Sequence, residues 1–138
     1  MRTLRLFPLV LALAAGCGQA VNSFADAADQ GVVVMNDYAS ILASVTDKSS
    51  AEAAKPKLEA IAKRMSEIVE AMKGLSPPNS DEMNQRSETV RTAMQGVSTQ
   101  VTACMDRSRS DPEIAGVIRE SWGAVTKQLA PLRAMLDV

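Results

Sequence analysis

The chain has 138 residues, enough for one domain or for one domain behind a targeting segment. Hydrophobic residues make up 46% of it, aromatic residues only 3%, and Met occurs eight times. A core must therefore consist of aliphatic side chains and Met, which favours packed helices over a β-sandwich. The 15 basic and 16 acidic side chains are dispersed and leave a net charge of −1, which argues against a nucleic-acid-binding protein.

The sequence contains no His. His is the commonest general base, the commonest zinc ligand and the usual proton switch near neutral pH. Motifs for phosphate, dinucleotide or calcium binding are also absent from the sequence. We therefore expect neither an enzyme nor a protein with a bound cofactor.

The amino-terminal residues have the form of a secretory signal. Arg2 and Arg5 precede an apolar run from residue 6 to residue 15, and the small residues Gly16 and Cys17 follow. Ten apolar residues form a helix of about 15 Å, half the thickness of a bilayer's hydrocarbon core. The run is therefore too short for a permanent transmembrane helix.

The sequence Leu13-Ala14-Ala15-Gly16-Cys17 resembles the lipobox of bacterial lipoprotein precursors. In that family the Cys becomes the first mature residue and carries acyl chains. The resemblance covers about the first seventeen residues, and it departs from the commonest pattern because the Leu lies four positions before the Cys and Ala14 lies three before it.

The resemblance implies a signal peptide over residues 1–16, lipidation at Cys17, a short linker over 17–22 and a mature domain over 23–138. Gly18 follows the Cys where Asp would signal retention, which implies an exported protein anchored to the outer membrane and facing the periplasm. The alternative is ordinary cleavage after Ala20, which would discard Cys17 and release a freely diffusing exported protein.

Four stretches of the mature domain repeat apolar residues at alternating spacings of three and four, the heptad period of helices that pack along one face. The Val32-Val33-Val34 run lies inside this period and is better explained by a helix than by a strand. The expected core positions are Phe24, Ala28, Gly31, Met35, Tyr38, Leu42 and Val45; Leu58, Ile61, Met65, Ile68, Met72 and Leu75; Met83, Ser87, Val90, Met94, Val97, Val101, Cys104 and Ser108; and Ile118, Trp122, Val125, Leu129, Leu132 and Leu136.

Capping residues predict where the helices begin. Ser23 and Ser49 each stand three residues before an acidic residue, as in a capping box, and Asp111 is a strong cap for the fourth helix. The third helix is expected to begin within Asn79-Ser80-Asp81-Glu82. Pro112 suits a first helical position.

Two prolines and one glycine predict interruptions. Pro56 is expected to kink the second helix or to begin it, and Pro131 to bend the fourth helix near its end. Gly74 is expected to take a left-handed conformation after the second helix, before Pro77-Pro78.

Four helices of similar length with short connections predict an up-down-up-down four-helix bundle. The alternative is a three-helix bundle with a detached first helix, because that segment lies nearest the membrane and its charged residues are all acidic.

Two residues of the expected core are chemically distinctive. If Cys17 is acylated, Cys104 is the remaining thiol and cannot form an intramolecular disulfide. Its place on the core face predicts a packing role, although the nearby Arg107 keeps a reactive thiol as the alternative. Trp122 is expected to be a core anchor.

These features predict a small lipid-anchored protein of the cell envelope that acts by binding an envelope partner or as a structural element. The alternative is an exported ligand- or metal-binding protein in which Met side chains, Cys104 and Trp122 line a cavity. Five apolar residues off the strict heptad positions are expected either to widen the core faces or to form a face for self-association: Val32, Val33, Ile41, Val69 and Val117.

Overall fold

The computed structural model describes residues 20–76 and 78–136, without the side chains of residues 129, 132, 133, 135 and 136. The proposed signal peptide and Cys17 lie outside the described residues. Four α-helices and a short 3₁₀ helix follow one another: α1 (Phe24–Ser44), α2 (Lys48–Met72), α3 (Ser80–Arg107), η2 (Ser108–Ser110) and α4 (Pro112–Leu136).

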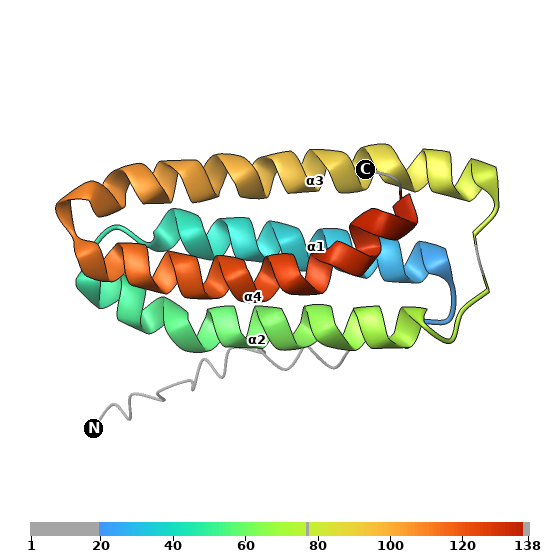
Figure 1. Cartoon of the computed structure of the whole chain (residues 1–138), viewed down its shortest axis with the longest axis horizontal. Coiled ribbons are helices and arrows are strands. Elements are labelled where there is room, and N and C mark those ends of the chain that lie inside the picture. The colour runs from blue at the N-terminus through green and yellow to red at the C-terminus, as the bar shows by residue number, and fades with distance from the viewer. Residues whose placement is uncertain (1–19, 77, 137–138) are drawn as a thin grey trace, which may run out of the picture.

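The helices form the predicted four-helix bundle, with successive helices running in opposite directions (Figure 1). The first helix is not detached, because α1 packs extensively against both α2 and α3. The helix α4 in turn packs against α2 and α3, so α2 and α3 occupy opposite corners of the bundle although they are consecutive in sequence. The connection over residues 73–79 therefore crosses one end of the bundle.

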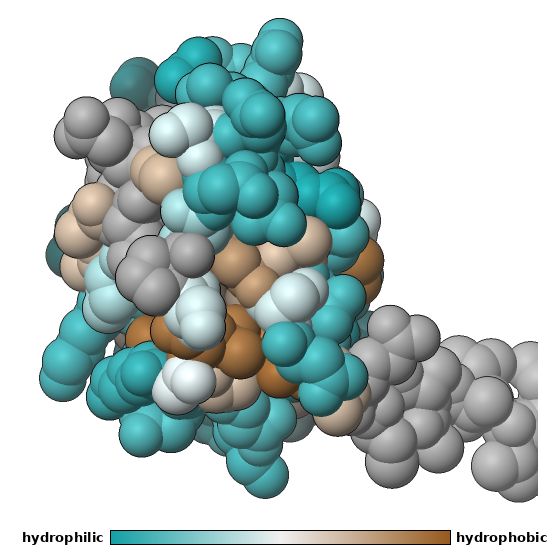
Figure 2. Space-filling view, turned by 90° about the vertical axis from the view of Figure 1, so that its right-hand side faces the viewer, coloured by the Kyte–Doolittle hydropathy of each residue, from teal (hydrophilic) through white to brown (hydrophobic). Residues whose placement is uncertain are grey.

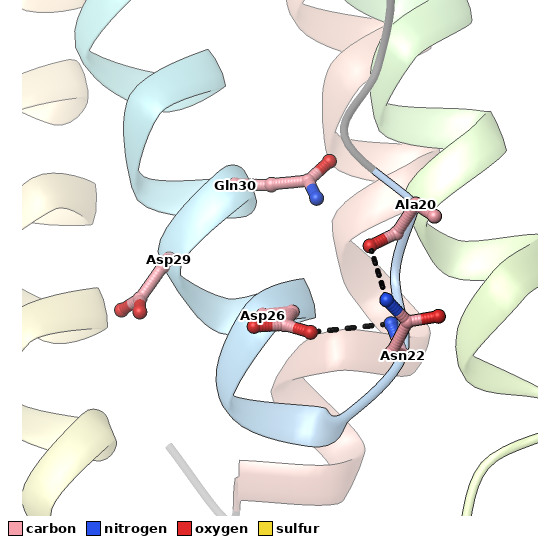
Figure 3. Close-up of a pocket in the computed structure, with 5 residues that line it drawn as sticks. All are labelled: Ala20, Asn22, Asp26, Asp29 and Gln30. Carbon is pink, nitrogen blue, oxygen red and sulfur yellow. Dashed lines mark hydrogen bonds between the residues drawn. The ribbon is translucent and has the colours of Figure 1, made fainter.

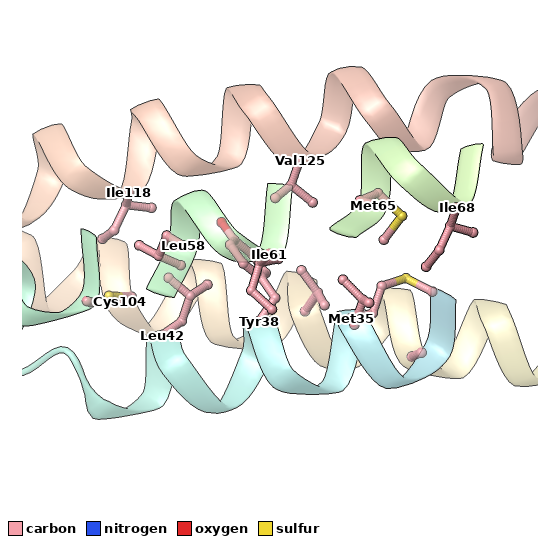
Figure 4. Packing of buried hydrophobic residues seen from close by; sticks show 14 of the residues in the cluster. Met35, Tyr38, Leu42, Leu58, Ile61, Met65, Ile68, Cys104, Ile118 and Val125 are labelled. Atoms are coloured by element: carbon pink, nitrogen blue, oxygen red, sulfur yellow. The ribbon is translucent and has the colours of Figure 1, made fainter. Parts of the chain in front are cut away.

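The core follows the predicted heptad positions, although four of the eight expected in the third helix are only partly buried: Met83, Ser87, Met94 and Val101. Every expected position of α1 and the five of α2 are buried, and Leu75, just after α2, is partly buried. Figure 4 shows side chains of the core meeting between the helices. The structure does not describe the side chains at the expected positions Leu129, Leu132 and Leu136.

The residues off the strict heptad positions divide into three groups. Val69 and Val117 are buried, Val32 and Ile41 are partly buried against the core, and Val33 is 50% exposed. The core faces are thus wider than a strict heptad stripe, as expected for helices that each contact two neighbours.

Three of the predicted helix starts are confirmed by capping hydrogen bonds. Ser23 Oγ accepts from the Asp26 amide at 3.1 Å, and Asp111 Oδ1 accepts from the Glu113 amide at 3.0 Å. At α3, Asn79 and Glu82 bond reciprocally to each other's backbone amides. These bonds satisfy amides that the first turn of a helix leaves without partners.

The predicted start of α2 at Ser49 is wrong. Asp47 is the N-cap: its carboxylate accepts from the Ser50 amide at 2.8 Å, and the Ser50 hydroxyl oxygen accepts from the Asp47 amide at 3.0 Å. A carboxylate two residues earlier therefore takes the capping role that the sequence assigned to Ser49. The bonds that the Asp47 carboxylate accepts from the Ser50 amide and hydroxyl lower the pKa of Asp47.

The helix α2 continues through Pro56, so the alternative that the helix begins there is wrong. In Figure 1 its first turns are inclined to the remainder of the helix, and the last turns of α4, which include Pro131, are inclined as well. A ring that removes one amide and crowds the preceding turn accounts for both bends.

The predicted left-handed Gly74 is also wrong. The backbone there has no positive φ, and α2 ends in a pair of tight turns in which Gly74 N donates to Ala71 O and Leu75 N donates to Met72 O. Because these turns satisfy the last carbonyls, no left-handed residue is needed.

Candidate functional site

Cys104 is fully buried, as its place in the heptad predicted. Its Sγ lies 3.9 Å from the carbonyl oxygen of Val45, which follows the last turn of α1. A thiol without exposed surface cannot meet a reagent in the folded state, so the structure supports the packing role.

Arg107 does not act on Cys104 but caps the end of α1. Its Nε donates to the carbonyl oxygen of Val45 and its Nη2 to that of Leu42, both at 3.0 Å. The carbonyls at the end of a helix lack intrahelical partners and carry partial negative charge, which suits a guanidinium group. The Arg107 side chain therefore joins α3 to the C-terminal end of α1 by two hydrogen bonds.

Tyr38 of α1 reaches Ser121 of α4 across the core, with 3.2 Å between the two hydroxyl oxygens. Ser121 donates its hydrogen to the Ile118 carbonyl at 3.1 Å, so Tyr38 is the donor to Ser121. Burial raises the pKa of Tyr38. The Ser121 hydroxyl partly opposes this rise, because it can turn to donate to the phenolate when Tyr38 is ionised. These groups form a satisfied polar contact inside an apolar core.

Trp122, the expected core anchor, is partly buried and packs against the core. Its ring stacks on that of Tyr38, with 6.2 Å between centroids and 23° between ring planes. The bulky indole thus covers the core from the side and remains partly accessible to solvent.

Five Met side chains contribute to the core. Met35, Met65 and Met72 are buried, and Met94 and Met105 pack partly buried against the core. Among the residues that the structure describes, no three Cys, Asp or Glu side chains are grouped so that they could hold a metal ion.

A surface depression of about 430 Å³ lies beside the first turns of α1 (Figure 3). Asn22 is one of the residues that line it: its amide donates to Asp26 and its side chain to the Ala20 carbonyl. Asp29 points away from this pair and forms an ion pair with Arg86 of α3 at 2.8 Å. Helix capping and packing thus account for these contacts.

Ion pairs also link the helices on other faces. Lys48 of α2 pairs with Glu113 of α4 at 2.9 Å beside a second depression, and Arg64 of α2 pairs with Asp37 of α1 at 3.1 Å. Exposed pairs of this kind contribute little stability, but they help to fix which helices are neighbours.

No family model, curated protein or solved structure matches the chain. None of the helices within the described ranges combines the length and apolar content needed to span a membrane.

Two contacts between helices were not predicted from the sequence: the hydrogen bonds from Arg107 to the end of α1 and the bond between Tyr38 and Ser121. Both join residues more than fifty positions apart. The presence of a polar residue at position 121, beside the core position 122, was the one signal available for the second contact.

Proposed function

We propose that this chain is a lipid-anchored helical module of the cell envelope that acts by binding a partner through its surface. The observation that carries the proposal is the packed interior. The four helices meet on apolar side chains, and the Tyr38–Ser121 contact satisfies the polar groups it buries. A bundle filled in this way offers its outer faces for binding in preference to its interior.

The outer faces differ strongly in charge. On α3, residues 92–105 include no charged side chain, whereas on α2 charged residues recur along the whole helix. Threonines and glutamines cover the outer side of α3, and a further depression lies on the surface between α3 and α1; it is lined by Val32, Asn36, Gln85, Glu88, Thr89, Thr92 and Ala93, of which only Glu88 is charged. Depletion of charge is typical of the centre of protein interfaces, so we assign partner binding to the α1–α3 face.

Lipidation is tested by the intact mass of the protein from membrane and soluble fractions of its native host, compared with a Cys17→Ser variant. The proposal expects a chain that begins at Cys17 with added acyl chains, and loss of both features in the variant. An unmodified chain that begins at Val21 would contradict the anchor and would favour the freely diffusing exported protein.

Partner binding is tested with a photo-crosslinking residue at Thr99, on the α1–α3 face, and at Lys57 as a matched exposed control on α2. We expect one defined envelope protein to be crosslinked in intact cells from position 99 and not from position 57. Equal crosslinking from both positions would contradict the assignment of this face.

A further inference from the structure

The end of the bundle from which residues 20–23 extend also holds the start of α3 and the end of α2 (Figure 1). Figure 2 looks onto this end, and apolar side chains gather at its centre, surrounded by hydrophilic ones. Val21, Leu75 and Met83, which belong to the segments meeting here, are only partly buried. Apolar side chains of the described residues are therefore partly exposed at this end.

The chain outside the structure indicates what covers this surface. Only three steps along the chain separate Ala20 from Cys17, and three extended residues span about 10 Å at most. An acylated Cys17 would hold this end next to the lipid headgroups. This step rests on the lipid anchor of the proposed function.

The charges at this end indicate which headgroups it meets. Lys73 and Arg86 are each held in an ion pair, with Glu70 and Asp29 respectively. The exposed Asp81 and Glu82 add negative charge in the first turn of α3. A surface of this kind suits zwitterionic headgroups, since anionic lipids attract clusters of free Lys and Arg.

We propose that the bundle stands upright on the bilayer, with the end formed by Val21, Leu75 and Met83 seated among zwitterionic headgroups. The 28 residues of α3 then carry the opposite end, at η2, about 42 Å above the membrane. The α1–α3 face stands perpendicular to the membrane and stays accessible to a partner along its length.

The experiment uses the intact lipidated protein in phosphatidylethanolamine–phosphatidylcholine vesicles that contain a nitroxide-labelled lipid. A fluorophore is attached through Ser76→Cys at the membrane end, Thr99→Cys on the side or Ser110→Cys at the far end; all three positions are exposed, while Cys104 is buried. We expect several-fold stronger quenching at position 76 than at positions 99 and 110. Circular dichroism confirms that each labelled protein is folded.

A pair of matched substitutions tests the apolar surface itself. Leu75→Asp in the protein labelled at position 76 is expected to reduce the quenching several-fold, because it replaces an apolar side chain of this surface with a charged one, which costs free energy to remove from water. Val33→Asp, which changes an exposed Val on the side of α1, should leave it unchanged. Anionic lipid in the vesicles should not strengthen the quenching.

The outcomes separate this inference from the function on which it rests. If mass spectrometry finds no acyl chain, the proposed anchor and this orientation both fail. If the protein is lipidated but position 99 is quenched as strongly as position 76, the bundle lies on its side and the upright orientation alone is overturned. Equal, weak quenching at all three positions would also overturn the upright orientation, because the bundle would then make no lasting contact with the membrane surface.

Discussion

The hydroxyl groups of Tyr38 and Ser121 meet across the diagonal of the bundle, between two helices that are not extensive neighbours. Ser121 in turn donates its hydroxyl hydrogen to the Ile118 carbonyl of its own helix. This contact fixes the register of α1 against α4, because sliding either helix by one turn would leave a buried hydroxyl without its partner.

Ionisation of Tyr38 should weaken folding at alkaline pH. Burial raises the pKa of this group in the folded protein above its ordinary value of 10.0, so the unfolded chain loses its proton first. Stability from this group is complete below pH 10.0 and is lost as the pH rises through the folded-state pKa. Tyr38 is the only tyrosine, so tyrosinate absorbance reports its titration alone.

The control for this prediction is Tyr38→Phe, which removes both the ionisation and the hydrogen bond. We expect it to cost about 1 kcal/mol at neutral pH and to flatten the alkaline decline in the free energy of unfolding relative to wild type. An identical decline in both proteins, measured by denaturant unfolding across a pH series, would show that other groups cause it.

Removing the indole of Trp122 should have a moderate effect. Trp122→Ala loses the stacking on Tyr38 and uncovers one side of the core, but the ring is partly exposed already. We expect a loss of about 2 kcal/mol in the free energy of unfolding, below the range for fully buried aromatic residues. Trp122→Phe keeps an aromatic ring and should lose less, as followed by circular dichroism in denaturant.

Arg107→Ala should destabilise the protein by about 2 kcal/mol, because it removes two charged hydrogen bonds to the end of α1. Arg109→Ala is the matched control: Arg109 is exposed and pairs only with Asp106 nearby in sequence, so its loss should change stability little. Thermal unfolding of the two variants side by side tests the difference. Equal effects would mean that the cap on α1 contributes nothing.

Cys104 should resist thiol reagents in the native protein and react when the bundle unfolds, because it is fully buried. The measurement follows modification of the free thiol in buffer and at increasing denaturant concentration. The midpoint of reactivity should coincide with the unfolding midpoint seen by Trp122 fluorescence. Rapid modification in buffer would contradict the packing role of Cys104 and favour the alternative of a reactive thiol.

The heptad pattern predicted the core well because burial depends on periodicity within each helix. Every expected position in α1, from Phe24 to Val45, is buried. The caps Ser23 and Asp111 and the helix start at residues 79–82 were equally predictable, since a cap bonds to amides within a few residues of itself. Asp47 was missed because two plausible caps lie close together, and the choice between them depends on local geometry.

Contacts between helices could not be predicted in the same way. Spacing identifies which face of α3 is buried, but it does not say that α3 lies beside α1 and diagonally from α2. The role of Arg107 depends on that arrangement, because only a helix packed on α1 can reach the Val45 carbonyl. The resemblance at Cys17 concerns residues outside the described structure and stays a prediction.

The diagonal crossing at residues 73–79 divides the molecule into two helical hairpins, α1–α2 and α3–α4, that associate side by side. Each helix of one hairpin packs on a parallel helix of the other, α1 on α3 and α2 on α4. The contacts that join the hairpins would therefore survive a single cut in this connection. Two fragments, each a hairpin, should reassemble into the native bundle when mixed, as followed by circular dichroism.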